Sequence, residues 1–485
     1  MLNQVQHDRI PPFTEALHEK LSYLDYWSPI NELYMYPFNT EHLVIISITS
    51  VTALVVIFLM AVTLRRVKKT RYYRRLDLAR KKYEITLPHI LGNGLPIPDE
   101  CYRIKRYSPE WQAIEEILLS AVEDKVISVD SVAGYLDQLN YIDTYIKNLR
   151  SGNKFRRALA AEKLGRLRVS NASSDLIKTL SDPSREVRTV AVRALGAINT
   201  PDALNPLIEL LVPAVHDPEF LPLRVLKTAV KKYKEAAIHY LLPLLHHNSW
   251  RVRAQAADML GEIGIQAPAE ELMPMLNDPE PDVRAKAARA LGKVKAKEAV
   301  QPLGRRIKDT SWVVRLQIAK ALGLTGGGDA VPLLLELVSD THWQVRAAAA
   351  NSLCRLGNFA IPSLLKMLFH SKDRYAREQI VEELQKTDIL NAEINKLGSK
   401  NKKEREIASI LLVAAGSNGA INLIEEAVKL HVNPDTRIRL VHVLSLINHP
   451  RSSEILRVVS ECDENEGVRF VAKKVLEKEV AQSQL

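Results

Sequence analysis

Side chains that commonly catalyse reactions or bind metals are scattered along this chain and form no recognisable site. The thirteen histidines are densest at His239, His246 and His247, where no cysteine or carboxylate group with metal-ligand spacing accompanies them. The three cysteines lie far apart in the sequence, which indicates a reducing compartment and no disulfide framework. We therefore expect no catalytic residues, no metal ligands and no cofactor, and we predict that the protein is not an enzyme.

A glycine-rich loop can hold a phosphate group, and Gly326-Gly327-Gly328 is the longest glycine run here. No β-rich run precedes it and no Lys-Ser or Lys-Thr pair follows it, so the phosphate-loop pattern is absent. We interpret the run as a turn. Function must then be sought in the surface that the elements of the chain build.

The formal net charge of +10 comes largely from one short segment. Residues 65–82 contain ten basic residues and one acidic residue, whereas residues 1–41 contain two basic and six acidic residues. The rest of the chain carries only +5, so a basic surface that suits nucleic acid is not indicated. We expect no nucleic-acid partner.

The 22 residues from Leu43 to Leu64 contain no charged side chain. A helix of this length can cross about 30 Å of hydrocarbon. A cleaved signal peptide would have a shorter apolar run that begins earlier and ends in small residues. We therefore predict one transmembrane helix over residues 42–64.

The charges on either side of this segment predict its orientation, because Lys and Arg are enriched on the cytoplasmic side. We expect the N-terminus outside and the remainder in the cytoplasm, at a cytoplasmic (inner) membrane. Seven cations are expected to face the anionic lipid of the cytoplasmic leaflet: Arg65, Arg66, Lys68, Lys69, Arg71, Arg74 and Arg75.

Two short segments flank the predicted span. In residues 1–41, Phe13, Leu17, Leu21 and Leu24 predict a short amphipathic helix, and the Tyr and Trp residues that follow suit the headgroup region. A small contact with a membrane partner is the alternative for this extracytoplasmic segment.

On the other side, Tyr72, Leu76, Ala79 and Tyr83 are spaced 4, 3 and 4 residues apart, which predicts one stripe of a helix. Either this basic segment only determines topology, or the stripe lies on the lipid surface.

The largest part of the chain repeats about every 31 residues, and arginine marks the register. A leucine follows seven residues after each of ten arginines: Arg157, Arg188, Arg253, Arg284, Arg315, Arg346, Arg377, Arg405, Arg437 and Arg469. A degenerate unit around Leu223–Arg224 falls in the double step between Arg188 and Arg253. Periods of 20–50 residues indicate stacked supersecondary units rather than one globular core.

One unit shows what each repeat builds. Asp278 before proline is a helix-start signal, and Val283, Ala287 and Leu291 then lie on one face of a helix. We expect the helix to end at Gly292 in a left-handed conformation. A second apolar run follows before the pattern restarts, so each unit is predicted to be a helical hairpin that buries its face by stacking.

Residues 182–211 (DPSREVRTVAVRALGAINTPDALNPLIELL) resemble a short HEAT-like repeat. The shared marks are Asp-Pro, Val-Arg, an alanine-rich turn, Leu-Gly and a Pro-Leu-x-x-x-Leu second helix. The resemblance covers roughly residues 151–480 and implies an all-α, right-handed α-solenoid of about ten or eleven HEAT-like hairpins. It also implies a surface that binds proteins, without naming the partner.

Some HEAT-like proteins are phycobilin lyases or DNA glycosylases, and both fit poorly with a membrane anchor and a nearly neutral array. The domain organisation that we predict has five parts: an extracytoplasmic segment (1–41), a transmembrane helix (42–64), a basic juxtamembrane helix and linker (65–110), capping helices (111–150) and the HEAT-like solenoid (151–485).

Trp250, Trp312 and Trp343 each stand three residues before a register arginine. They could form an exposed row of binding hot spots, but packing between repeats is the favoured interpretation. In HEAT-like folds the second helices line the concave face, so the resemblance makes four further residues candidates for partner binding: Glu209, Arg305, Glu336 and Lys366. The register arginines are expected to tie repeats together through carboxylates and carbonyls.

We therefore predict a membrane-anchored cytoplasmic scaffold that binds protein partners. Its layout resembles that of bacterial single-span HEAT proteins, some of which accompany membrane glycosyltransferases in extracellular polysaccharide biosynthesis. That resemblance suggests a subunit or regulator of such a synthase. The alternative is a recruiter that docks a soluble cytosolic signalling or envelope-biogenesis protein to the membrane.

Overall fold

The computed structural model describes residues 40–93, 95–123, 127–265 and 268–483, which fold as helices without a strand. They divide into two compact units, with unit 1 ending at Ser128 and unit 2 beginning at Val129. The amphipathic helix predicted around Phe13 lies outside the described residues. The helices of unit 1 are α2 (Thr40–Tyr83), α3 (Thr86–Gly92), α4 (Asp99–Tyr102) and α5 (Pro109–Glu123).

Helix α2 has two parts with opposite surroundings. Every side chain from Leu43 to Leu64 is exposed, as Leu54 (65%) and Phe58 (66%) illustrate. The later stripe of Leu76, Ala79 and Tyr83 is at most 5% exposed and belongs to the core of unit 1. One continuous helix therefore joins an uncovered apolar segment to a packed basic segment.

The basic part of α2 packs on α5. Leu76 and Ala79 pack against Ala113, and the Tyr72 hydroxyl hydrogen-bonds the side-chain carbonyl of Gln112. The expected stripe is therefore correct as a helix face, but α5 occupies it and it does not lie on lipid. The expected capping helices (111–150) are divided between the units, because α5 follows α2 whereas the next two helices begin unit 2.

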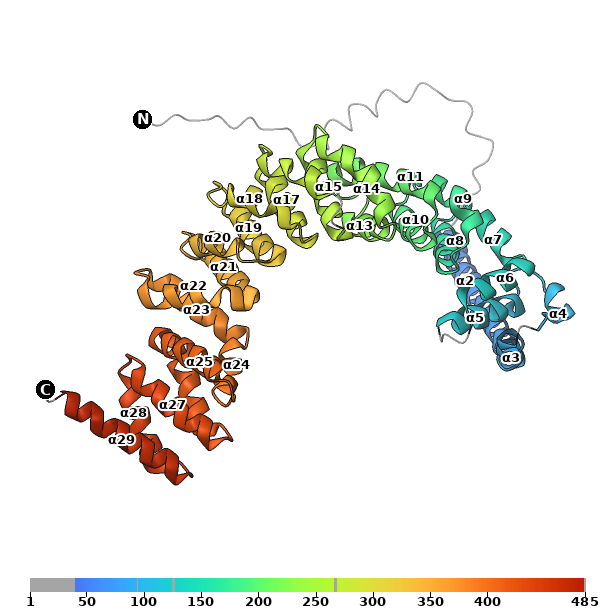
Figure 1. Cartoon of the computed structure of the whole chain (residues 1–485). Coiled ribbons are helices and arrows are strands. Elements are labelled where there is room, and N and C mark those ends of the chain that lie inside the picture. Colours follow the sequence, from blue (N-terminus) through green and yellow to red (C-terminus); the bar gives the residue numbers. More distant parts are fainter. Residues whose placement is uncertain (1–39, 94, 124–126, 266–267, 484–485) are drawn as a thin grey trace, which may run out of the picture. The chain divides into compact units, whose positions relative to one another are not determined.

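Unit 2 is a stack of helical hairpins in chain order, preceded by α6 (Val129–Gln138) and α7 (Tyr141–Asn148) (Figure 1). The first helices of the hairpins are α8 (Lys154–Arg166), α10 (Arg185–Ile198), α13 (Leu223–Lys231), α15 (Trp250–Ile263), α17 (Pro281–Lys293), α19 (Trp312–Thr325), α21 (Trp343–Leu356), α23 (Arg374–Lys386), α25 (Lys402–Ala415) and α27 (Pro434–Leu446).

The second helices are α9 (Ser173–Thr179), α11 (Leu204–Glu209) with α12 (Leu211–His216), α14 (Glu235–Leu241), α16 (Ala269–Leu272), α18 (Val300–Gly304), α20 (Ala330–Val338), α22 (Ile361–His370), α24 (Ile389–Lys396), α26 (Ile421–Leu430) and α28 (Arg451–Cys462). Helix α29 (Glu466–Ser483) completes the stack, so the described residues confirm an all-α solenoid of the predicted size.

Short 3-10 turns precede or extend several second helices: Ser170–Ala172, Pro201–Ala203, Leu242–His246, Pro274–Asn277, Lys297–Ala299 and Gly357–Phe359. A π-helical segment, Gly416–Ala420, joins α25 to α26.

Successive first helices touch along a line of small residues. A Cβ added to Gly165, Gly261 or Gly292 would lie 2.5–2.7 Å from the Cα of an alanine in the next first helix. Real side chains do not approach that closely, so only glycine allows this spacing. The second helices contact one another much less than the first helices do. The first helices therefore form the closely packed row of unit 2.

The expected end of a helix at Gly292 is wrong. Gly292 lies inside α17, and its missing side chain makes room for Ala321 of α19. The rest of the expectation for this unit is confirmed, because Val283, Ala287 and Leu291 are fully buried. The Leu-Gly pair of the repeat thus marks helix contact rather than helix termination.

Register arginines tie consecutive repeats together, as predicted. In what we call the arginine clamp, the guanidinium Nε and Nη2 donate to the two carboxylate oxygens of an aspartate 25 or 26 residues later. The clamps are Arg157–Asp182, Arg253–Asp278, Arg284–Asp309, Arg315–Asp340 and Arg437–Asp463.

The clamp is replaced where the sequence lacks the aspartate. Arg188 donates to the backbone carbonyl of Phe220, and Arg377 donates to the Asn418 side chain. Arg346 has Ser371 at the position 25 residues later, and its Nε is buried with no partner among the described residues. In every repeat, the arginine Nη1 still donates to the carbonyl six residues earlier.

Candidate partner-binding surface

The three tryptophans at one register position do not share one environment. The Trp312 ring stacks on His342 of the following repeat, with 4.0 Å between ring centroids and 3° between ring planes. Trp250 is half-buried, and the guanidinium of Arg251 lies 4.9 Å from its ring centroid. Trp343 is 60% exposed. Packing between repeats therefore describes Trp312 but not Trp343, which offers a large aromatic surface to a partner.

The four candidates on the second helices are all exposed. Glu209 ends α11, Arg305 follows α18, and Glu336 and Lys366 lie on α20 and α22. Glu336 pairs with Lys308 at 3.0 Å. The structure places them on different hairpins rather than in one cluster, and their contact with a partner stays a prediction.

Two columns of charged side chains, which sequence reasoning missed, cross the first helices of unit 2. The first column is Lys227, Asp258 and Arg289, one residue from each of α13, α15 and α17. Asp258 is 3% exposed and accepts hydrogen bonds from Lys227 at 2.5 Å, from Lys286 at 3.5 Å and from Arg289. Three cations on two neighbouring helices thus enclose one carboxylate.

The second column runs beside the first and has the same order of charges. Glu262 of α15 pairs with Lys231 of α13 at 3.6 Å and with Lys293 of α17. Since each member of a column is 31 residues from the next, the columns could have been found by aligning the repeats and comparing charges position by position.

The electrostatics of Asp258 follow from this enclosure. Burial acts to raise the pKa of its carboxyl, but the hydrogen bond from Lys227 and the charges of Lys286 and Arg289 outweigh it. The pKa of Asp258 is therefore lowered, whereas burial lowers the pKa of the Lys286 ammonium. The cluster holds its carboxylate ionised in a site largely removed from water.

A cleft of about 350 Å³ lies one repeat before these columns, between α10 and α13. Its lining includes Arg193 of α10 and, from α13 and its C-terminal cap, Arg224, Thr228 and Lys232. All four are exposed, and no carboxylate lines the cleft among the described residues. We call this site the basic cleft.

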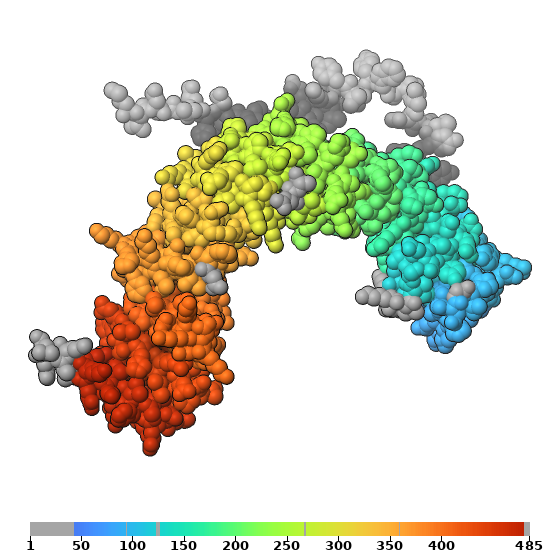
Figure 2. Space-filling model, viewed as in Figure 1, coloured from blue at the N-terminus to red at the C-terminus, as the bar shows by residue number. Residues whose placement is uncertain are grey.

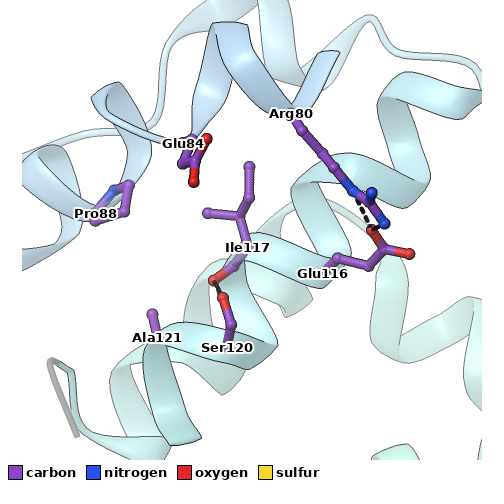
Figure 3. A pocket seen from close by; sticks show the side chains of 7 residues that line it. All are labelled: Arg80, Glu84, Pro88, Glu116, Ile117, Ser120 and Ala121. Carbon is purple, nitrogen blue, oxygen red and sulfur yellow. Dashed lines mark hydrogen bonds and ion pairs between the residues drawn. The ribbon is translucent and has the colours of Figure 1, made fainter. Parts of the chain in front are cut away.

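Unit 1 has its own pocket of about 520 Å³, which α2 and α5 line together (Figure 3). Arg80 reaches across it and binds Glu116 at 2.6 Å, while Ile117 and Ala121 supply an apolar wall. The hydrogen bond to Glu116 raises the pKa of Arg80. The pair uses the charges of this pocket internally and holds the basic part of α2 on α5.

The seven predicted membrane-surface cations lie on α2 between the apolar segment and the contact with α5. They are all exposed: Arg65, Arg66, Lys68, Lys69, Arg71, Arg74 and Arg75. Tyr73 lies among them, with the Lys69 ammonium 5.8 Å from its ring centroid. This arrangement leaves the cations available to anionic headgroups, which stays a prediction.

Within the described ranges, no group of three His, Cys, Asp or Glu side chains has the arrangement of a metal site. The densest histidine group is spread along α14 and the turn after it: His239 is on α14, His246 ends that turn and His247 follows it. His247 accepts or donates locally at Ser249. This is a turn contact and not a ligand set.

A family model described as HEAT repeats matches residues 142–217, 238–315 and 302–385. The unmatched stretch between the first two matches contains α13 and most of the basic cleft. No curated protein matches the sequence.

Solved structures resemble the chain at low identity. An engineered protein is 18% identical (TM-score 0.32), with 69% of this chain and 98% of that protein covered. Kap121p bound to the extreme C-terminus of the protein phosphatase Cdc14p is 15% identical (TM-score 0.42), with 82% and 51% covered. The CpcE–CpcF complex of phycocyanin lyase from Nostoc sp. PCC7120 is 21% identical (TM-score 0.23), with 62% and 92% covered. The chain thus spans about half the length of the karyopherin.

Proposed function

From the premise that this chain is a HEAT-repeat protein, matched in three consecutive stretches, we propose that it is a membrane-anchored scaffold that holds protein partners in the cytoplasm. The anchor is the apolar part of α2, and the binding surface is the helical stack of unit 2. HEAT solenoids of this kind act by binding rather than by catalysis, and we propose no reaction for the chain.

The observation that carries the anchor is the exposure of α2. An 18-residue window within Leu43–Tyr83 has a mean hydropathy of 2.8, and none of it is buried. The other apolar candidate, Lys402–Leu430, is half buried and contains the π-helical segment, as expected for core helices. Leaving 22 apolar residues in water is unfavourable by about 25 cal/mol per Å² of apolar surface, and hydrocarbon removes that cost.

The charge asymmetry supports an orientation. The cations from Arg65 to Arg75 are exposed on α2 immediately after the apolar part, where the anionic inner leaflet would attract them. We propose an inner-membrane protein with its N-terminus outside and unit 2 in the cytoplasm. A tag before Leu2 that is digested by protease added to intact spheroplasts, while unit 2 is spared, would support this orientation. The opposite pattern would contradict it.

Trp343 supports a protein partner, since exposed tryptophans are typical interface hot spots. The partner that the layout favours is an integral membrane enzyme, such as a glycosyltransferase for extracellular polysaccharide. The second candidate function is recruitment of a soluble cytosolic protein, which the isolated exposure of Trp343 far from α2 in sequence would serve equally well.

Affinity purification from native membranes in mild detergent, followed by mass spectrometry, separates the two. The full-length chain is compared with a chain that lacks residues 1–64, which keeps Tyr72 and the α5 contact. An integral enzyme captured only by the full-length chain supports the subunit role. The same soluble protein captured by both supports recruitment. Capture of no specific protein by either chain would contradict the scaffold function.

A further inference from the structure

We infer that the basic cleft binds an acidic peptide segment of a protein partner through Arg193, Arg224 and Lys232. This inference rests on the proposed scaffold function and names the chemistry of its partner.

The cleft exists because the stack departs from its repeat at α13. The register position that carries arginine in the other repeats is Pro222 here, and Arg188 donates to the Phe220 carbonyl instead of to an aspartate. The guanidinium of Arg188 also lies 4.5 Å from the centroid of the Phe220 ring. Asp217 accepts a bond from the Glu219 amide and leaves the clamp vacant. The turn before α13 is thus built differently from the turns of the regular repeats.

The floor of the cleft is a close helix contact. A Cβ at Gly196 of α10 would lie 2.7 Å from the Cα of Ala229 on α13, so the two backbones touch there. Ala229 and Val225 line the cleft beside the cations. A ligand would therefore meet an apolar floor with positive charges along its rim.

The neighbouring repeat shows what such cations hold. Lys227 of the same helix α13 points to Asp258 on the α15 side, where Lys286 and Arg289 complete the enclosure of that carboxylate. On the α10 side, the cations of the basic cleft have no carboxylate among its described lining residues. The regular stack supplies an internal carboxylate on one side of α13, and an external one would complete the other side.

The spacing of the cations favours an extended ligand. Arg224 and Lys232 are eight residues apart on one helix, which corresponds to about 12 Å at 1.5 Å per residue. One phosphate or one carboxylate cannot contact both, whereas an acidic peptide can. Beyond α13, Asp258 and Glu262 neutralise the columns, so the unpaired positive charge ends where a short segment would end. A long polyanion such as nucleic acid would find no continuation.

The test uses the full-length protein in detergent micelles and a fluorescent peptide of alternating glutamate and alanine, about ten residues long, which can extend to roughly 33 Å. Anisotropy gives the affinity. The test variant is R193E/R224E/K232E, and R193Q/R224Q/K232Q provides a milder change. The matched control, R305E/K366E/K372E, makes the same change in formal charge at three exposed cations on or next to second helices.

We expect the test variant to bind the peptide at least about tenfold more weakly, and the control to change binding less than about twofold. Higher salt should weaken wild-type binding because the contacts are exposed. Equal losses in the two variants, or no loss, would overturn the inference. So would displacement of the peptide by inorganic phosphate or a single-stranded oligonucleotide at lower concentration than by unlabelled peptide. Because purified protein is used, peptide binding is judged independently of whether the native partner is captured.

Discussion

Arg284 of α17 holds Asp309 of the next repeat by two parallel hydrogen bonds, Nε to Oδ2 at 2.7 Å and Nη2 to Oδ1 at 2.8 Å. The two side chains are only 9% and 2% exposed. The same aspartate accepts a bond from the Ser311 amide, which starts the following helix. One buried carboxylate thereby joins two hairpins and shapes the turn between them.

Replacing this carboxylate should destabilise the stack strongly, because a buried guanidinium would lose its counter-charge. We expect Asp309→Ala to lower the free energy of unfolding by about 3–5 kcal/mol in urea titrations. Hydrogen exchange should increase first in α17 and α19, since repeats stabilise mainly their neighbours. The control is Glu466→Ala, whose carboxylate lies 3.8 Å from Arg469 but is 94% exposed. A similar loss in both variants would show that the clamp does not stabilise the fold.

The lowered pKa of Asp258 predicts a pH dependence. Its stabilising contribution is complete above the ordinary carboxyl value of 3.8 and is lost as the pH falls through the lower folded-state pKa. The difference in unfolding free energy between wild type and Asp258→Asn should therefore be constant near neutral pH and shrink below about pH 4. Chemical unfolding between pH 7 and pH 3 measures it. A difference that grows on acidification would contradict the assigned direction.

The contact at Gly292 predicts a steric effect. A side chain there would meet the Cα of Ala321 at 2.7 Å, so Gly292→Val should cost about 1–3 kcal/mol of unfolding free energy. Adding Ala321→Gly should not restore stability, because the Cα itself is the obstacle. Gly328→Ala is the control, since nothing lies within 4 Å of that position. Full rescue by Ala321→Gly would place the obstacle elsewhere.

The exposed part of α2 predicts sensitivity to charge. Leu54 and Ile57 are 65% and 62% exposed, and an arginine at each should cost about 2.5–3.5 kcal/mol at the centre of a membrane helix. The double variant should be extracted from membranes at alkaline pH, whereas wild type stays. Val67→Arg, in the basic part, should behave as wild type. Retention of the double variant would argue against a spanning helix.

Two tryptophans at one register position predict opposite outcomes. Trp312→Ala should lower stability by about 0.5–1.5 kcal/mol beyond lost burial, because it removes the stack on His342. Trp343→Ala should leave the thermal midpoint nearly unchanged and reduce partner capture, because its ring is 60% exposed. Unchanged capture would remove Trp343 from the binding surface.

The hairpin architecture could be predicted because one column of residues carries it. Val283, Ala287 and Leu291 share a face by spacing alone, and all are fully buried. The role of Gly292 could not be predicted, because glycine suits both a helix end and a close helix contact. Only the neighbouring backbone at Ala321 decides between the two.

The candidate surface was predicted less completely. Register position located the tryptophans but could not distinguish Trp312 from Trp343, since the difference comes from His342 of the next repeat. The charged columns escaped detection because Lys227, Asp258 and Arg289 are unremarkable singly and become a cluster only through stacking. The stripe ending at Tyr83 was recognised, yet its partner α5 was not.

The arginine clamp also acts as a length gauge. From Arg253 to Arg346 the register arginines are 31 residues apart, and each of the three clamps in that stretch spans 25 residues. Where the clamp is absent, after Arg346, the next intervals include 28 and 32 residues. Insertions and deletions are thus confined to hairpins that have given up the ion pair. The clamped hairpins are interchangeable blocks, which duplication or excision in steps of one period would leave in register.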